Sequence, residues 1–201
     1  MPVLIGALLG MSTLIFIGPV FFYLLKSSVE SGWKAGISVA LGIIAGDVIC
    51  VFLAMMGGEQ FINDSEHIFW IALGGGALLV SMGIKYIIWP FIQPERRKKH
   101  HAGSILIYFT HGFIINFVNP FVFVVWFGFT TYIREEFSTD RAVWLALSTT
   151  LLVIFVTDCL KAVLASKLNR IVRPERMLKW MRVFGVIMLI FGIRLLLYPF
   201  F

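Results

Sequence analysis

Six long apolar runs constrain this chain more than any other feature of its sequence. A helix that crosses the roughly 30 Å hydrocarbon core of a bilayer needs about 20 apolar residues. The runs cover residues 3–25, 35–57, 68–91, 105–130, 142–165 and 183–201. Helices satisfy their own backbone polar groups, so each run predicts one transmembrane helix.

Composition supports a membrane setting. Hydrophobic residues make up 59% of the 201 residues and charged residues 14%, whereas soluble domains average about 45–50% apolar and about 25% charged. We expect one all-α integral membrane domain over residues 1–201. The formal charge of +6 lies mostly between the apolar runs, which indicates contact with lipid headgroups rather than nucleic acid. No motif for a cofactor or a metal ion is present.

The charges between the runs predict the orientation. Twelve Lys and Arg residues lie in the first, third and fifth connections, and two lie in the second and fourth. Because basic connections stay in the cytoplasm, we expect the connection 93–104 to be cytoplasmic and both termini to be outside. The predicted location is the cell (inner) membrane, with six spans.

An internal repeat divides the chain into two halves. The segment 76–91 reads GALLVSMGIKYIIWPF, and 185–200 reads GVIMLIFGIRLLLYPF, at a constant shift of 109 residues. We expect a first three-helix repeat in 1–92, a basic linker in 93–104 and a second repeat in 105–201. An odd number of spans per repeat makes the two halves inverted, as in many secondary transporters.

Asp47 lies in the middle of the second apolar run. A carboxylate at that depth costs about 2.5–3.5 kcal/mol on insertion scales and usually faces a cavity or a partner. Asp47 is therefore predicted to bind a proton or a substrate amine. The alternative is a structural pair, for example with Lys85.

Asp158 occupies the matching place in the fifth run. Lys161 follows three residues later and shares its helix face. A local ion pair could therefore neutralise Asp158 without any transport role. The functional reading rests on its symmetry with Asp47.

Two prolines interrupt the first and fourth runs at matched positions. Pro19 follows Gly18, and Pro120 follows Asn119. Proline lacks the backbone donor that a helix needs, so each helix should kink or break there. A broken helix presents a half-helix N-terminus that suits a substrate carboxylate. We expect Asn116 and Asn119 to add amide groups at positions i and i+3 on one helix face.

Small residues recur every four positions on the second run, at Ser38, Gly42 and Gly46. This spacing predicts close approach of two helix backbones, and it would also allow a homodimer. Cys50 and Cys159 lie near the two aspartates and leave open a second function, a transmembrane thiol–disulfide electron carrier. A scaffold that transports nothing is a third reading.

Two segments resemble the LysE/RhtB family of amino-acid exporters. SGWKAGISVALGIIAGDVIC, residues 31–50, is similar to the second-helix signature of that family, and GFIINFVNP, residues 112–120, to its fourth-helix segment ending in Asn-Pro. Ile17 and Phe121 depart from the family, which often has proline and lysine there.

The resemblance implies a secondary exporter of amino acids or related small polar metabolites, energised by an ion gradient. No nucleotide-binding motif is present, so direct use of ATP is not expected. The predicted partners are a small-molecule substrate and the lipid bilayer, and no enzyme activity is expected. The predicted substrate or coupling path comprises Gly18, Pro19, Asp47, Asn116, Asn119, Pro120 and Asp158.

Overall fold

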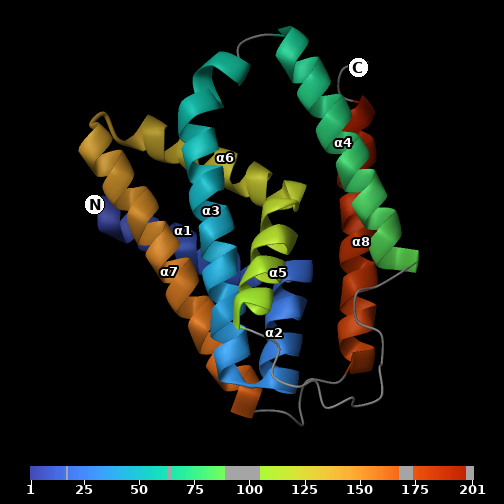
Figure 1. Ribbon diagram of the computed structural model, residues 1–201. Coiled ribbons are helices and arrows are strands. Elements are labelled where there is room, and N and C mark those ends of the chain that lie inside the picture. Colours follow the sequence, from blue (N-terminus) through green and yellow to red (C-terminus); the bar gives the residue numbers. More distant parts are fainter. Residues whose placement is uncertain (17, 63–64, 89–104, 168–173, 198–201) are drawn as a thin grey trace. The chain divides into compact units, whose positions relative to one another are not determined.

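The described part of the chain is helical. The computed structural model describes residues 1–16, 18–62, 65–88, 105–167 and 174–197, and no strand occurs among them. The elements are α1 (Pro2–Ser12), the 3-10 turn η1 (Thr13–Ile15), α2 (Pro19–Ser31), α3 (Trp33–Ile62), α4 (Ser65–Ile88), α5 (Ile105–Phe117), α6 (Pro120–Glu136), α7 (Asp140–Lys167) and α8 (Pro174–Leu197) (Figure 1). The expected all-α class is confirmed.

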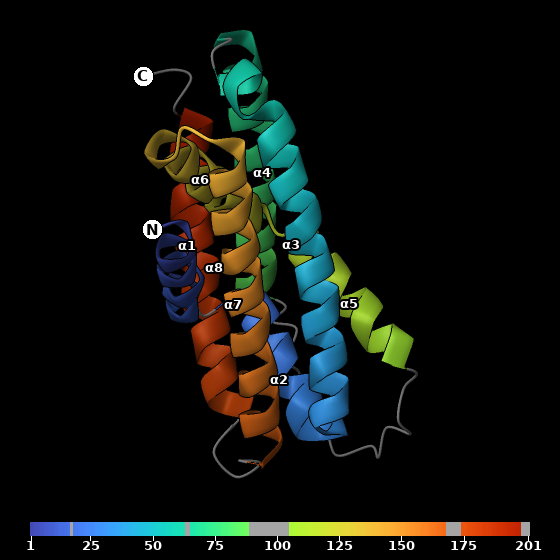
Figure 2. The ribbon, with the colours of Figure 1, turned by 90° about the vertical axis from the view of Figure 1, so that its left-hand side faces the viewer.

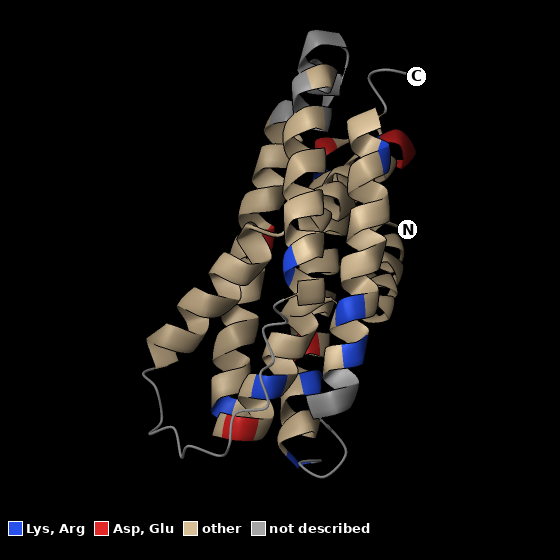
Figure 3. Ribbon diagram, turned by 90° about the vertical axis from the view of Figure 1, so that its right-hand side faces the viewer, with Lys and Arg blue, Asp and Glu red and all other residues tan. Residues whose placement is uncertain are grey.

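The helices account for most of the predicted spans. Three stretches are long and apolar enough to cross a membrane, namely Trp33–Met56, Asp140–Lys167 and Leu178–Leu197. Two further spans arise if each bent pair, α1–η1 with α2 and α5 with α6, counts as one. The remaining run, 68–91, coincides with α4, whose described apolar stretch, Leu73–Ile88, is shorter. The number of six spans therefore stays a prediction. Most charged residues lie towards the helix ends (Figure 3).

The chain forms two compact units. The larger contains residues 1–56 and 97–172, and the smaller contains 57–96 and 173–201. Each unit takes helices from both predicted sequence halves, so the proposed halves 1–92 and 105–201 are not tested by this division. The predicted basic linker 93–104 lies almost wholly outside the described residues.

Close helix contacts in the larger unit depend on small residues. A methyl group on Gly42 of α3 would overlap the carbonyl oxygen of Phe109 in α5, and one on Gly6 of α1 would overlap that of Ala146 in α7. The Ser38 hydroxyl donates a hydrogen bond to the Ile105 carbonyl. The expected close approach along the Ser38–Gly42–Gly46 stripe is thus confirmed, and its partner is α5 of the same chain.

Two apolar clusters of buried residues lie in the larger unit. One cluster combines buried residues of α3, α6 and α7, among them Val51, Ile133 and Leu147. A second combines Leu24 of α2 with Val39 and Ile43 of α3. α2 turns back beside α3 (Figures 1 and 2), and Gly32 permits this turn with φ of 88°.

The smaller unit is an antiparallel pair of α4 and α8. Gly83 lies against the backbone of Gly185, and Gly76 lies against that of Gly192. These four glycines are the ones that the 109-residue repeat relates. The repeat matches Gly76 with Gly185 and Gly83 with Gly192. Replacing each glycine of the Gly76–Gly192 contact by its match gives the Gly83–Gly185 contact, as expected for a local two-fold axis.

Candidate functional site

The first helix breaks before Pro19. η1 ends at Ile15, the extended Gly18 forms the N-cap, and α2 starts at Pro19, in a direction 77° from α1. Proline has no N–H to donate, and its fixed φ suits the first position of a helix. Within the described residues, no side chain caps the N-terminus of α2. The predicted break at Pro19 is confirmed.

The second break, before Pro120, has the same form but carries its own cap. α5 ends at Phe117 and α6 starts at Pro120, with a bend of 68°. The Asn119 side-chain oxygen accepts a hydrogen bond of 3.2 Å from the Phe121 N–H, as N-cap residues do. The predicted break is confirmed. The expectation that Asn116 and Asn119 share one helix face is wrong, because α5 ends between them.

The two breaks meet. The Phe16 ring, at the end of η1, packs edge-on against the Phe121 ring in the first turn of α6, with centroids 5.2 Å apart. Such T-shaped pairs are a favoured aromatic geometry. Segments 105 residues apart in the sequence are thus neighbours at the points where their helices are interrupted.

Asp47 joins α3 to both sides of the second break. Its Oδ1 accepts hydrogen bonds of 2.9 Å from Asn116 Nδ2, before the break, and from Trp126 Nε1, after it. Asn116 also donates to the Ile43 carbonyl at 2.9 Å. Asp47 is only 4% exposed, and both partners are buried. Two neutral donors therefore hold this carboxylate inside the helix bundle.

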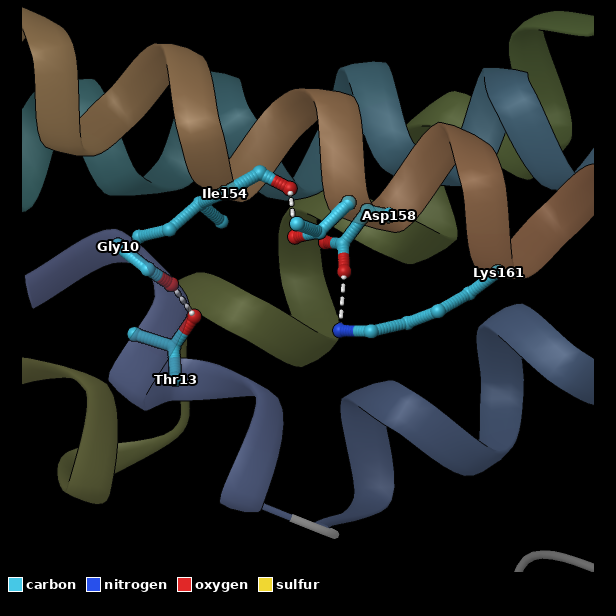
Figure 4. Close-up of polar contacts among 6 residues, drawn as sticks. Gly10, Thr13, Ile154, Asp158 and Lys161 are labelled. Carbon is cyan, nitrogen blue, oxygen red and sulfur yellow. Dashed lines mark hydrogen bonds and ion pairs between the residues drawn. The ribbon is translucent and has the colours of Figure 1, made fainter. Parts of the chain in front are cut away.

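Asp158 has a charged partner instead. Lys161 Nζ lies 2.8 Å from Asp158 Oδ1, and Asp158 is 8% exposed. Figure 4 shows both side chains on the side of α7 that faces Gly10, near the end of α1, and Thr13, at the start of η1. The local ion pair considered for Asp158 is present in the structure.

Asp158 lies beside the first break as Asp47 lies beside the second. Before the break, Gly10 packs against Val153 of α7. After the break, Lys161 Nζ lies 5.8 Å from the centre of the Phe21 ring, in the first turn of α2. Asp158 lies between these two contacts on α7. Each aspartate therefore lies beside the broken helix of the other predicted repeat.

Four residues of this region were not among the predicted site residues. Trp126 could have been noticed as an indole donor in an apolar helix, because a buried Trp N–H usually has an acceptor. Lys161 was noticed only as a partner that would neutralise Asp158. No local signal pairs Phe16 with Phe121, since their contact depends on how the broken helices pack.

The two cysteines are free thiols. Cys50 is fully buried in the apolar cluster of α3, α6 and α7. Cys159 is partly buried and packs beside Ile43 and its neighbours. Both cysteines therefore have the surroundings of small side chains that fill space in an apolar core.

Comparison with known proteins identifies the family. The profile of the LysE type translocators matches residues 11–198, nearly the whole chain. This chain belongs to the LysE type translocator family. Members of this family are transporters and not enzymes, so the electron-carrier alternative is not favoured.

Curated relatives are similar over part of their length. A leucine efflux protein of Enterobacter sp. (strain 638) is 29% identical over 139 residues, which are 67% of this chain and 64% of the relative. Leucine efflux proteins of Salmonella typhimurium (strain LT2) and Salmonella typhi are each 30% identical over 104 residues, 51% of this chain and 49% of the relative. The matched region spans about half to two thirds of these proteins. No solved structure matches the chain significantly.

Proposed function

We propose that this LysE type translocator is a secondary exporter of amino acids or related small polar metabolites, driven by the proton gradient. Membership of the family supports transport, and the relatives named as leucine efflux proteins support an amino acid as the solute. The solute binds where the two broken helices meet, near Gly18, Pro19, Asn119 and Pro120. Asp47, Asn116 and Asp158 border this region.

One observation carries the proposal: a buried aspartate lies beside each helix break, and the two breaks touch. Broken helices at the interface of repeats form the substrate and ion sites of many secondary transporters, because their unwound segments expose polar backbone groups inside the membrane. Ionisable side chains within membrane spans commonly belong to proton or substrate pathways. Protonation of Asp47 shifts the balance between inward-open and outward-open states as the halves rock about the site.

The proposal includes six spans in two inverted repeats, both termini outside and the loop 93–104 in the cytoplasm of the inner membrane. The glycine contacts between α4 and α8 support the repeat, because the 109-residue shift exchanges them. The basic connections support the orientation. Pairing of two copies stays a subsidiary proposal, since α3 uses its glycine stripe to contact α5.

Proteoliposomes test the function and the coupling together. Vesicles that contain wild-type protein are loaded with single amino acids, and efflux is measured with and without an imposed pH gradient. We expect the gradient to accelerate efflux of at least one amino acid. Asp47→Asn should keep the fold, because an amide oxygen can still accept from Asn116 and Trp126, but efflux should no longer respond to the gradient.

The exposed Asp140, at the start of α7, supplies the matched control. Asp140→Asn removes a carboxylate of the same unit and should leave the gradient response intact. Absence of efflux for every amino acid would refute the proposed function. A folded Asp47→Asn protein that still responds to the gradient like the wild type would show that Asp47 is not the coupling site.

A further inference from the structure

The direction of the Lys161 side chain is unusual for its place in α7. Lys161 lies less than two turns before Lys167, the last residue of the helix. A lysine near a span end normally extends towards the aqueous interface. Lys161 instead reaches back to Asp158, at 2.8 Å, and its side chain is only 20% exposed. Lys161 is therefore paired and partly buried instead of extended to the interface.

The ion pair lies where the first helix is interrupted. Lys161 Nζ is 5.8 Å from the ring of Phe21, which belongs to the first turn of α2. That turn begins at the extended Gly18, and in the described chain no side chain caps it. The matching turn of α6 has its cap filled by Asn119. Positive charge thus gathers at the first break, from Lys161 and from the helix N-terminus.

The two halves differ at this point. Three residues after Asp158 stands Lys161, and three residues after Asp47 stands Cys50. Asp47 is held by the amide of Asn116 and the indole of Trp126, so its partners carry no charge. Among the described contacts, the Asp158 side presents one negative and one positive group together on one face of α7, whereas Asp47 has two neutral donors.

We propose that Asp158 and Lys161 are the binding site for the charged main-chain groups of the exported amino acid. The Lys161 ammonium binds the substrate α-carboxylate, Asp158 binds the α-ammonium, and the pair closes on itself when the site is empty. The proposal rests on the export function proposed above and assigns its substrate site. In this proposal, Asp158 and Lys161 bind the solute, and Asp47 binds the proton.

Charge balance explains why a zwitterion suits this pair. A buried ion pair that loses one partner leaves an uncompensated charge, which is strongly unfavourable in a low dielectric. A zwitterion that enters between the two groups replaces one ion pair by two and leaves the net charge at zero. An amine without a carboxylate would leave Lys161 without a negative partner, and a carboxylate without an amine would leave Asp158 without a positive one. Both main-chain charges should therefore be required for binding.

Binding of three compounds to the wild-type protein tests the proposal without any mutation. L-Leucine carries both charges, 3-methylbutylamine lacks the carboxylate, and 4-methylpentanoate lacks the ammonium. Ligand-dependent increases in the unfolding temperature of the purified full-length protein report binding. We expect stabilisation by L-leucine and a half-saturating concentration at least about tenfold higher for each analogue. An analogue that binds as tightly as L-leucine would overturn the proposal.

Variants test whether L-leucine binds at Asp158 and Lys161. The double variant Asp158→Asn/Lys161→Met removes both charges and leaves none unpaired, and it should weaken L-leucine binding at least about tenfold. Lys161→Arg keeps the positive charge and should retain most of the binding. Lys167→Met removes an exposed lysine of the same helix and should have no effect.

The outcomes separate this inference from the export function. If the wild type exports L-leucine, and the folded double variant binds and exports it with an unchanged half-saturating concentration, Asp158 and Lys161 do not hold the substrate although export stands. If the wild type exports no amino acid, the export function fails and this assignment fails with it.

Discussion

At the scale of residues, the two buried aspartates are stabilised in different ways. Asp47 accepts two hydrogen bonds from neutral donors on other helices, whereas Asp158 pairs with a lysine of its own helix. The first arrangement links α3 to α5 and α6 by hydrogen bonds, whereas the ion pair of the second lies within α7. We therefore expect mutations around Asp47 to affect the fold more than mutations around Asp158.

Trp126→Phe tests the contribution of the indole donor. Phenylalanine keeps an aromatic ring in the apolar cluster but removes the N–H that lies 2.9 Å from Asp47 Oδ1. Hydrogen bonds between membrane helices contribute about 0.6 kcal/mol on average and up to about 1.7 kcal/mol. We expect a loss of stability in that range, seen as a lower unfolding temperature in detergent.

Trp144→Phe is the matched control, since Trp144 lies on the exposed side of α7. It replaces the same side chain in the same unit and should leave the unfolding temperature nearly unchanged. Equal stability of the two variants would show that the bond from Trp126 to Asp47 contributes nothing to the fold.

At the scale of elements, glycines let helices approach until their backbones touch. The contact of α3 with α5 depends on Gly42, because a methyl group there would overlap the carbonyl oxygen of Phe109 and crowd the Phe113 N–H. Farther along α3, Gly46 lies against Asn116, the residue that holds Asp47. The packing of these two helices thus sets the geometry of the Asp47 site.

Gly42→Ala should push α3 and α5 apart. Overpacking of a tight contact typically costs about 1–3 kcal/mol, and the backbone of α5 cannot move aside as a flexible side chain could. We expect a lower unfolding temperature and weaker coupling of efflux to the pH gradient, since Asn116 would shift relative to Asp47.

Gly128→Ala provides the comparison for this substitution. Gly128 lies inside α6 with no atom within 4 Å of an added methyl group. Alanine is favoured over glycine in a helix by about 1 kcal/mol, so this variant should be as stable as the wild type or more stable. A destabilised Gly128→Ala together with an unaffected Gly42→Ala would contradict the close contact of α3 with α5.

At the scale of the whole molecule, connections rich in Lys and Arg alternate with connections that have few, and this pattern predicts the orientation of the chain in the membrane. The turn between α6 and α7 contains the exposed Ser138, and the strongly basic connection contains Lys99. The positive-inside rule assigns these two sites to opposite sides of the membrane. This orientation agrees with the inverted halves of the proposed function.

Cysteine labelling in intact cells tests the orientation. In a background with Cys50 and Cys159 replaced by alanine, Ser138→Cys should react with a membrane-impermeant maleimide. Lys99→Cys should react only after the membrane is permeabilised. Labelling of Lys99→Cys from outside would reverse the predicted orientation.

The sequence by itself determined the features that depend on local chemistry. The apolar runs predicted the all-α class, and the prolines at 19 and 120 predicted both breaks, because a missing N–H acts within one helical turn. The spacing of Asp158 and Lys161 also allowed their pairing, since residues three apart share a helix face.

Only the tertiary structure decided which groups from distant segments meet. Trp126 and Asn116 reach Asp47 across 79 and 69 residues of sequence, and Phe16 meets Phe121 where the breaks touch. The inward direction of Lys161 is likewise a result of packing, because its spacing allows either Asp158 or the interface as its partner. The helical period defines which face a residue occupies, but contacts such as that of Gly42 with Phe109 determine which helix lies opposite that face.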